Sequence, residues 1–251
     1  MKFSLKQEKL QELLEKLIVK DIFPSSLIST KGQTLYSIQK EEHGRALRFA
    51  KFNKSYFESI DDSDESIELD VERTLSVVKN ILPNTVLTVE TKGNKLSISG
   101  ERINVNIAFK EPEAKIETSL PFEMKDGIPL IGASKIPLDT VFSIKLSDFK
   151  SLSSYASSLK TEFYKFIIGN KKLTIKVGDL HNFSDFIVFE PESGIENDNS
   201  LDVIYTYAIP QIADTFRKDE VIIKTKTQSP AWVQETTDDY LLGILVPPYV
   251  E

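Results

Sequence analysis

The chain has 251 residues, no cysteine, two histidines and a formal net charge of −7 at pH 7. The lack of cysteine excludes disulfides, thiolate catalysis and cysteine-ligated zinc, and it fits a reducing cytoplasmic setting. The sequence contains no apolar run of the length that crosses a membrane, and its first residues lack the pattern of a signal peptide. We therefore expect a soluble, intracellular protein with no metal or cofactor, built as one large domain or two of ordinary size.

Two amphipathic helices are predicted in the first half of the chain. From Gln7 to Val19, leucine and isoleucine recur at i, i+3, i+4, i+7 and i+8, which is the apolar stripe of a helix packed on a core. A second helix begins at Val71, with Asp70 as its N-cap, and Pro83 ends it.

The second half repeats this arrangement. A third apolar stripe begins near Asp148, and a fourth begins near Ile209, where Pro210 fits the first helical turn. The spacing of the four helices suggests two similar halves, each of which is itself doubled. A repeated unit of this length is typical of duplicated domains and indicates a scaffold rather than a catalyst.

A hairpin turn follows three of the four predicted helices. In each of these three turns a glycine stands beside an asparagine or a glutamine, between two apolar runs. Glycine accepts the positive φ that such turns need. The fourth copy has no glycine. In chain order the four turns are Thr30–Leu35, Thr91–Leu96, Gly169–Leu173 and Thr225–Pro230.

Strands and one linker are predicted between the helices. Apolar and polar residues alternate from Ile103 to Phe109 and from Leu173 to Val177, which indicates half-buried antiparallel strands. Glu123–Asp139 contains two glycines and two Ile-Pro pairs, and it is the best candidate for a linker near the middle of the chain.

An enzymatic function requires a positioned nucleophile, acid-base pair or metal site. Two groups of acids and histidines are candidates, but both lie in predicted loops and neither has a recognised catalytic or metal-binding spacing. Surface loops are the favoured interpretation, and a metal-dependent enzyme is the less favoured one. The groups are Glu41, Glu42 and His43, and Asp179, His181 and Asp185.

Four segments of the chain match one known family in order and spacing. They are Lys31–Ile38, Val86–Ile98, Asp219–Trp232 and the C-terminal Val246–Glu251. With them in view, the chain resembles the sliding clamps of DNA replication, in particular the archaeal form of proliferating cell nuclear antigen. In the C-terminal segment Pro247 stands in place of the family's alanine and Tyr249 in place of a basic residue. The likeness covers nearly the whole chain.

This resemblance implies an α+β protein with the processivity-clamp fold. Two similar domains are expected, each a pseudo-duplicated β-α-β-β-β unit with helices on an inner face and antiparallel sheets outside. Residues 1–122 would form the first domain, 123–139 the connector between domains, and 140–251 the second domain.

The resemblance also implies a polymerase processivity factor without enzymatic activity. A homo- or heterotrimeric ring would surround double-stranded DNA independently of sequence. It would tether DNA polymerase, flap nuclease and ligase, and a separate clamp loader would place it on DNA. The alternative is a subunit of a hetero-oligomeric or clamp-like ring that scaffolds DNA repair factors. We expect the protein in the cytoplasm, associated with the nucleoid.

At the positions that face DNA in the family, this chain has fewer basic residues than family members have. Acidic or hydroxyl side chains stand at five positions where basic residues are common, and each missing cation lowers the attraction to DNA. This departure favours a subunit of a mixed ring. The expected DNA-facing residues are Lys9, Arg73, Lys79, Lys150, Arg217 and Lys218; the departures are Glu8, Glu15, Ser76, Ser151 and Ser154.

The family's second functional surface is an apolar pocket under the connector, into which partner proteins insert one aliphatic and two aromatic side chains. Either Ile-Pro pair could match the family's connector, and Ile38 and Val246 could equally belong to the core. By resemblance the pocket comprises Ile38, Ile128, Pro129, Ile136, Pro137, Pro230, Val246, Pro247 and Pro248.

Subunits of such rings join through edge strands, one from each half. Ala114–Phe122 is the expected edge in the first half, with Ile103–Phe109 as the second choice. Lys171–Asp179 is the expected edge in the second half.

Overall fold

The computed structural model describes residues 1–18, 25–41, 46–111, 122–125, 128–179, 185–196, 199–206 and 216–249. The chain divides into two compact units, and each unit combines segments that are separated in sequence. Unit 1 contains Met1–Glu41, Arg48–Leu120 and Thr236–Leu242. Unit 2 contains Glu42–Leu47, Pro121–Glu235 and Gly243–Glu251.

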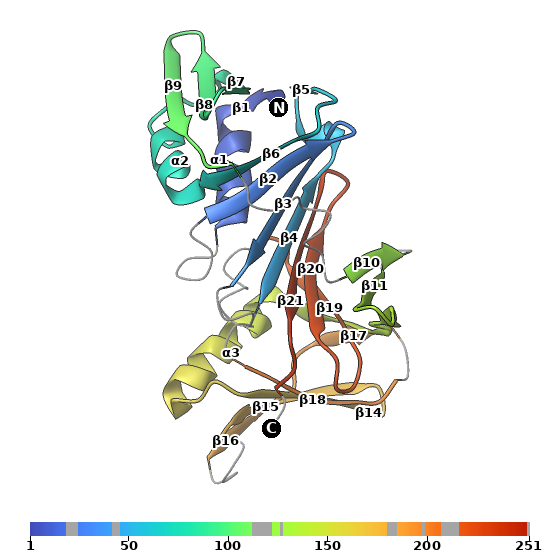
Figure 1. Cartoon of the computed structure of the whole chain (residues 1–251). Coiled ribbons are helices and arrows are strands. Elements are labelled where there is room, and N and C mark those ends of the chain that lie inside the picture. Colours follow the sequence, from blue (N-terminus) through green and yellow to red (C-terminus); the bar gives the residue numbers. More distant parts are fainter. Residues whose placement is uncertain are drawn as a thin grey trace. The chain divides into compact units, whose positions relative to one another are not determined.

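Unit 1 is built from two successive strand-helix-strand-strand-strand series (Figure 1). The first comprises β1 (Lys2–Lys6), α1 (Gln7–Leu17), β2 (Ser25–Lys31), β3 (Thr34–Lys40) and β4 (Leu47–Phe52). A short connection contains η1 (Lys54–Tyr56) and β5 (Ser59–Ile60). The second series comprises β6 (Glu65–Asp70), α2 (Val71–Val78), β7 (Val86–Lys92), β8 (Lys95–Gly100) and β9 (Ile103–Ala108).

Unit 2 repeats the pattern after a small sheet. That sheet contains β10 (Phe122–Lys125), β11 (Ile128–Ile131) and β12 (Ile136–Pro137). The series that follows comprises β13 (Thr140–Lys145), α3 (Leu146–Leu159), β14 (Tyr164–Gly169), β15 (Lys172–Gly178) and β16 (Phe186–Phe189). The remaining strands are β17 (Ser193–Ile195), β18 (Leu201–Tyr205), β19 (Glu220–Thr225), β20 (Ala231–Thr236) and β21 (Tyr240–Val246), whose first three residues fall in unit 1.

Antiparallel sheets account for most of the described structure. Unit 1 contains the sheet β5-β1-β7-β8-β9 and the strand run β6-β2-β3-β4. Unit 2 contains the sheet β16-β15-β14-β18, the run β17-β13-β19-β20-β21 and the connector sheet β10-β11-β12. The expected α+β class, with antiparallel sheets and few helices, is confirmed.

The helices begin where the apolar periodicity places them. The first begins at Gln7 and the second at Val71, and the Asp70 carboxylate accepts a hydrogen bond of 2.9 Å from the backbone N–H of Arg73, as an N-cap does. The third begins at Leu146, slightly before the predicted start. The predicted fourth helix at Ile209 lies outside the described residues.

The predicted hairpin turns are present, but glycine does not always supply the positive φ. Gly32 and Gly93 have φ of 57° and 59°, as expected. In the turn that joins β14 to β15, Asn170 and Lys171 take the left-handed conformation, with φ of 52° and 58°. The fourth turn, which lacks glycine, uses Gln228 at φ 56°. In these two turns the pairing of the strands therefore imposes a positive φ on residues that do not favour it.

The expected linker is more regular than its composition indicates. Glu123–Asp139 contributes most of the connector sheet, in which Met124 lies opposite Pro129 and Leu130 opposite Pro137. Both prolines occupy strand positions, which is possible in short strands that need few backbone donors. The two Ile-Pro pairs are therefore neighbours in one sheet, and Ile131 lies opposite Ile136.

One of the expected sheet edges is wrong. β15, which covers most of Lys171–Asp179, lies inside its sheet between β14 and β16, so β16 is the edge. Among the described strands, β9 lies at an edge of the five-stranded sheet, so the second choice, Ile103–Phe109, stays a prediction for the subunit contact. The first choice, Ala114–Phe122, lies outside the described residues except for Phe122.

At the other edge of the unit 2 sheet, the Tyr249 N–H donates a 2.8 Å hydrogen bond to the Ile204 carbonyl, so the C-terminal segment covers β18.

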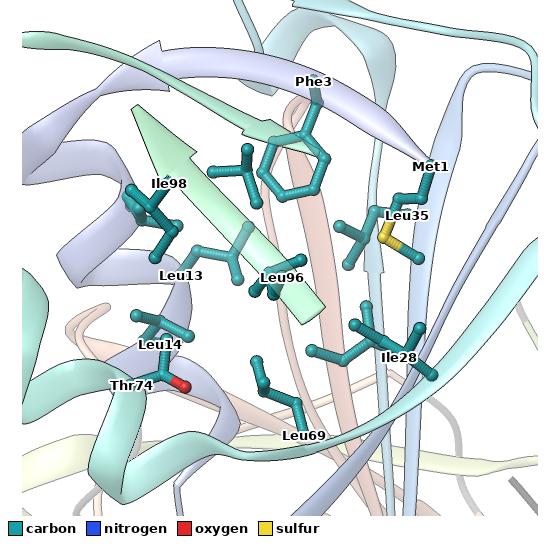
Figure 2. Close-up of a pocket in the computed structure, with 13 residues that line it drawn as sticks. Met1, Phe3, Leu13, Leu14, Ile28, Leu35, Leu69, Thr74, Leu96 and Ile98 are labelled. Carbon is teal, nitrogen blue, oxygen red and sulfur yellow. The ribbon is translucent and has the colours of Figure 1, made fainter. Parts of the chain in front are cut away.

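The core of unit 1 contains the apolar faces of α1 and α2. Leu10, Leu13, Leu14 and Leu17 are all buried, and each contributes about 1.5–3 kcal/mol by leaving water. A cavity of about 20 Å³ remains between Leu10, Leu13 and Leu14 of α1 and the neighbouring strands (Figure 2). Its lining is apolar except for Thr74, whose hydroxyl donates to the Asp70 carbonyl. A gap of this size without free polar groups stays dry, so it is a packing defect and not a ligand site.

Arg48 is a buried cation on β4. Tyr36 and Phe49 have rings 6.3 Å apart on one face of the neighbouring strands β3 and β4, so alternation puts Gln39 and Arg48 on the opposite face. Arg48 is 1% exposed, and its guanidinium has no hydrogen-bond acceptor among the described residues. Burial lowers the pKa of Arg48 to about 9.

Within the described part of the chain, no helix has the length and apolar character needed to span a membrane.

Candidate nucleic-acid interface and partner pocket

Helix α1 carries Lys9, the first of the expected DNA-facing cations. Its ammonium lies 3.5 Å from a Glu12 carboxylate oxygen and 4.7 Å from the centre of the Tyr56 ring. The Tyr56 hydroxyl donates a 2.9 Å hydrogen bond to the Lys9 carbonyl, and burial raises the pKa of Tyr56. Lys9 is thus half-exposed but already paired, which reduces its attraction to an external anion.

Lys16 lies further along the same helix and faces the protein. It is 2% exposed, and its ammonium lies 3.4 Å from Glu12 and 3.2 Å from the Tyr240 hydroxyl. It also lies 4.3 Å from the centre of the Tyr240 ring, within the range of a cation–π contact. Glu12 therefore lies within ion-pair distance of two lysines of α1, and Lys16 does not reach solvent.

Helix α2 presents Arg73 to solvent, and Lys79 follows it at the C-cap. The Lys79 ammonium lies 3.5 Å from Glu15 of α1, so an ion pair joins the two helices. Both partners are partly exposed, and such a pair contributes little to stability. It does place a carboxylate beside a cation that is expected to face DNA.

Helix α3 presents Lys150 to solvent among several serines. Ser151 and Ser158 donate hydrogen bonds to carbonyls of the preceding helical turn, so these hydroxyls are used locally. The exposed face of α3 is polar and nearly uncharged.

The formal charge of the three described helices is slightly negative. α1 has three glutamates and two lysines, while α2 and α3 each have one acid and one base, which leaves a net charge of −1. The departures at Glu8 and Glu15, noted from the sequence, contribute to this balance.

By sequence, Arg217 and Lys218 close the predicted fourth helix, but in the structure both are non-helical and exposed. The buried carboxylate of Glu235 accepts hydrogen bonds from their backbone N–H groups, at 2.5 and 2.9 Å. An Arg217 side-chain nitrogen also donates to the Phe216 carbonyl at 3.2 Å. Glu235 thus fixes the backbone and leaves the Lys218 ammonium exposed on the surface.

The expected pocket residues fall in both units. Ile38 is a buried residue of unit 1, and the other eight belong to unit 2. Val246 is fully buried, so Ile38 and Val246 both serve as core residues, which was one of the two interpretations. Among the rest, Pro129 is buried, Ile136 is 43% exposed, and Pro137, Pro230, Pro247 and Pro248 are half-buried. For Ile128 only the backbone is described.

Three residues near the expected pocket were missed by the sequence reasoning. Trp232 lies fully buried on β20, Phe122 of the connector sheet packs on it at 4.8 Å between ring centres, and Gly243 of β21 lies beneath it. The single tryptophan, two residues after Pro230, was a possible signal, because a large buried side chain needs a small residue opposite it.

The enzymatic alternative gains no support from geometry. No group of three or more His, Asp or Glu side chains forms a possible metal site in the part of the chain that the structure describes. Glu42, His43 and His181, which belong to the two candidate groups, lie outside that part.

Neither a protein-family model nor a curated protein matches this chain. Solved structures do match. A crystal structure of proliferating cellular nuclear antigen (PCNA) from Entamoeba histolytica has a TM-score of 0.79 and 10% sequence identity, and covers 99% of this chain and 98% of its own. The chain has the PCNA sliding-clamp fold.

A second PCNA structure agrees with this assignment. A. fulgidus PCNA bound to the C-terminal region of FEN-1 has a TM-score of 0.77 and 14% identity, over 100% of this chain and 98% of the other. The resemblance to PCNA seen in the sequence is thus confirmed at the level of the fold. Identities this low show the fold alone.

Proposed function

We propose that this protein is a DNA sliding clamp: a ring that surrounds duplex DNA and tethers polymerase, nuclease and ligase, with no chemistry of its own. The observation that carries the proposal is the agreement with two PCNA folds over at least 98% of each chain compared. A separate ATP-driven loader would place the ring on DNA. The protein would act in the cytoplasm with the nucleoid.

Sequence-independent attraction suits a protein that must slide. Lysine and arginine that meet phosphates release counterions and bind DNA without reading bases. Arg73, Lys150, Arg217 and Lys218 are exposed cations at the expected positions. Lys9 and Lys79 would contribute less, because each is paired with a glutamate of α1.

Each unit offers a strand edge for ring closure. Among the described strands, β9 pairs only with β8, and β16 pairs only with β15. β16 has the sequence Phe-Ile-Val-Phe, with Phe186 45% and Val188 49% exposed. An apolar exposed edge is a hazard for a monomer but provides pairing in an oligomer. We propose antiparallel pairing of β9 of one copy with β16 of the next.

Charge and shape favour this pairing. Lys110 follows β9 and Asp185 precedes β16, so antiparallel strands bring these two opposite charges together at one end. At the other end Glu101 stands beside Arg102, and Glu190 is already paired with Lys172 at 2.7 Å. A groove of about 590 Å³ lies at the start of β9, lined by residues 80–86 and 101–103. Its rim includes Leu82, 74% exposed, and Val86, 52% exposed, which could receive apolar side chains of the next copy.

For partner proteins, we propose that short peptides bind on the connector sheet and the β20–β21 strands. Ile136, Pro137, Pro230 and Pro247 are the candidate contacts, because they retain exposure. Aromatic and aliphatic anchors would supply most of the affinity at such a site.

The helix charges favour a second candidate function, a subunit of a hetero-oligomeric ring. A net charge of −1 over α1, α2 and α3 gives weak attraction to DNA, and sister subunits with more basic helices could compensate. Mixing with candidate sister subunits separates the two cases, because a mixed-ring subunit would form stable oligomers only with them.

The test of topological binding compares circular and linear DNA of one sequence. Purified protein is loaded onto a nicked circle with a clamp loader, and retained protein is measured by gel filtration before and after a single restriction cut. A sliding ring stays on the circle and leaves the cut DNA through its ends. Equal retention on both forms would contradict the proposal.

A further inference from the structure

The single tryptophan of the chain is seated on a glycine. Trp232 is fully buried, and a Cβ placed on Gly243 would lie 1.9 Å from the nearest atom of its indole ring. The indole N–H donates a 2.8 Å hydrogen bond to the Gln234 side-chain oxygen. Trp232 therefore has a fixed position, because residue 243 has no side chain and Gln234 holds the ring.

Phe122 covers the tryptophan from the connector sheet. The two ring centres are 4.8 Å apart with an angle of 59° between planes, and Phe122 is 8% exposed. Phe122 is the first residue of β10, an edge strand of the small sheet β10-β11-β12. The cover thus belongs to a four-residue edge strand, whereas Trp232 belongs to the large strand run of unit 2.

This contact lies close in the chain to two expected pocket residues. Pro230 directly precedes β20, the strand of Trp232, and Pro247 directly follows the neighbouring strand β21, which contains Gly243. Pro230 and Pro247 belong to the expected pocket. The ring of Phe122 thus packs on a strand that adjoins the expected pocket, the site that partner peptides would use.

We propose that Phe122 is an intramolecular competitor for this site: an aromatic anchor of a partner peptide takes its place against Trp232. The inference rests on the proposed function, because it requires partner peptides to bind at the connector. Trp232 would then contact partner peptides, although it was not among the pocket residues expected from the sequence.

The size of the effect follows from the contact that must be exchanged. A site that is covered for part of the time binds with an affinity reduced by the fraction of molecules that are open. An aromatic pair is worth about three- to tenfold in an equilibrium constant. Removal of the Phe122 ring should therefore strengthen peptide binding by about three- to tenfold.

The experiment uses the full chain and two synthetic peptides. One 12-residue peptide carries an aliphatic residue and two adjacent aromatic residues, and the other has alanine in place of both aromatics. Binding is followed by calorimetry and by the emission of Trp232, which is the only tryptophan. The aromatic peptide should change the emission as Phe122 leaves the indole, and the alanine peptide should not.

Phe122→Ala should bind the aromatic peptide about three- to tenfold more tightly, and Phe122→Leu, which keeps an apolar cover, should fall between this variant and the wild type. Phe57→Ala is the matched control, because Phe57 is also 8% exposed and packs on Phe3 with ring centres 5.3 Å apart, but lies in unit 1. The control should lose comparable stability without a gain in affinity.

Unchanged or weaker binding by both Phe122 variants would overturn the inference, since it would mean that Phe122 only supports the site. Binding without a change in Trp232 emission would also overturn it. Retention on circular DNA is measured for the same preparations. Normal retention with no affinity gain rejects this inference alone, whereas loss of retention in the wild type rejects the proposed function.

Discussion

Unit 1 and unit 2 follow the same strand-helix-strand-strand-strand pattern, but their cores are filled in opposite ways. Unit 1 retains a dry cavity of about 20 Å³, and its strand β4 carries the buried Arg48. Unit 2 has no spare room where Trp232 lies on Gly243. The repeated pattern therefore determines the order of helices and strands in each unit, whereas the packing of each core depends on its individual residues. The predictions below test this contrast.

Gly243→Ala should produce the largest effect. The added methyl would lie 1.9 Å from Trp232, so the indole or the strand must move. Overpacking of this kind costs about 3 kcal/mol of unfolding free energy. Urea unfolding followed by Trp232 emission measures the loss.

The matching change in unit 1 is Val89→Ile, which adds one carbon beside the cavity. It should alter the unfolding free energy by less than about 1 kcal/mol, because the space to accept the carbon exists. If Gly243→Ala were as harmless as Val89→Ile, the contrast between the two cores would be wrong.

Arg48→Met should stabilise the protein by about 2 kcal/mol, because it removes a buried charge that has no hydrogen-bond acceptor among the described residues and keeps similar bulk. Lys51→Met is the control, since Lys51 lies half-buried on the same strand. It should change stability by less than about 0.5 kcal/mol.

Arg48 also gives a pH test with a definite sign. Burial lowers the pKa of Arg48 in the folded chain to about 9, from an ordinary value of 12.5. Between these values the unfolded chain binds more protons, so the contribution of this group to stability rises as pH increases above about 9. Denaturant melts from pH 8 to 10 should show this rise in the wild type relative to Arg48→Met. Parallel profiles would show that Arg48 is solvated or paired.

Val188→Lys addresses the contrast between the two strand edges. It places a cation on the apolar edge of unit 2 and should weaken association of copies by about tenfold, as one buried ion without a partner does. Sedimentation at several concentrations measures this. Unfolding of the monomer should change little, since Val188 is 49% exposed.

The matched pair on the other edge is Asn106→Glu and Asn106→Lys on β9. Because β16 is flanked by Asp185 and Glu190, the glutamate should weaken association and the lysine should not. Equal effects would show that the flanking charges play no part in pairing.

Glu15→Gln should have the smallest effect. It frees Lys79 from its carboxylate partner and raises the charge of α1, and it leaves Glu12, the partner of the buried Lys16, in place. DNA affinity should rise by about two- to threefold at low salt and converge with the wild type at high salt. Fluorescence anisotropy with duplex DNA measures both. A fall in affinity would place these helices away from DNA.

Much of the fold was predictable because it depends on local pattern. The leucine stripe of α1, the Asp70 cap of α2 and the glycine turn at Gly93 act within a few residues, and each is confirmed. The proline-containing connector strands were missed, since their pairing depends on neighbours such as Ile131 and Ile136 rather than on local preference.

The candidate site was predictable in outline and not in its contacts. The sequence identified Lys9 and Lys79 as cations on helix faces, but their glutamate partners depend on side-chain rotamers and on the packing of α1 against α2. The edge in unit 2 was misplaced because the apolar-polar alternation of β15 does not show whether another strand pairs beside it, and only the sheet order places β16 outside it. Trp232 and Phe122 meet across about half of the chain, a contact that no local pattern indicates.

The most direct test of the account is the mass of the purified protein in solution by light scattering, over nanomolar to micromolar concentration. Complementary edges on the two units predict one discrete closed oligomer, three chains of 28.4 kDa each by analogy with PCNA. Val188→Lys should shift its formation to higher concentration. A single-chain mass at every concentration would contradict closure of a ring by copies of this protein.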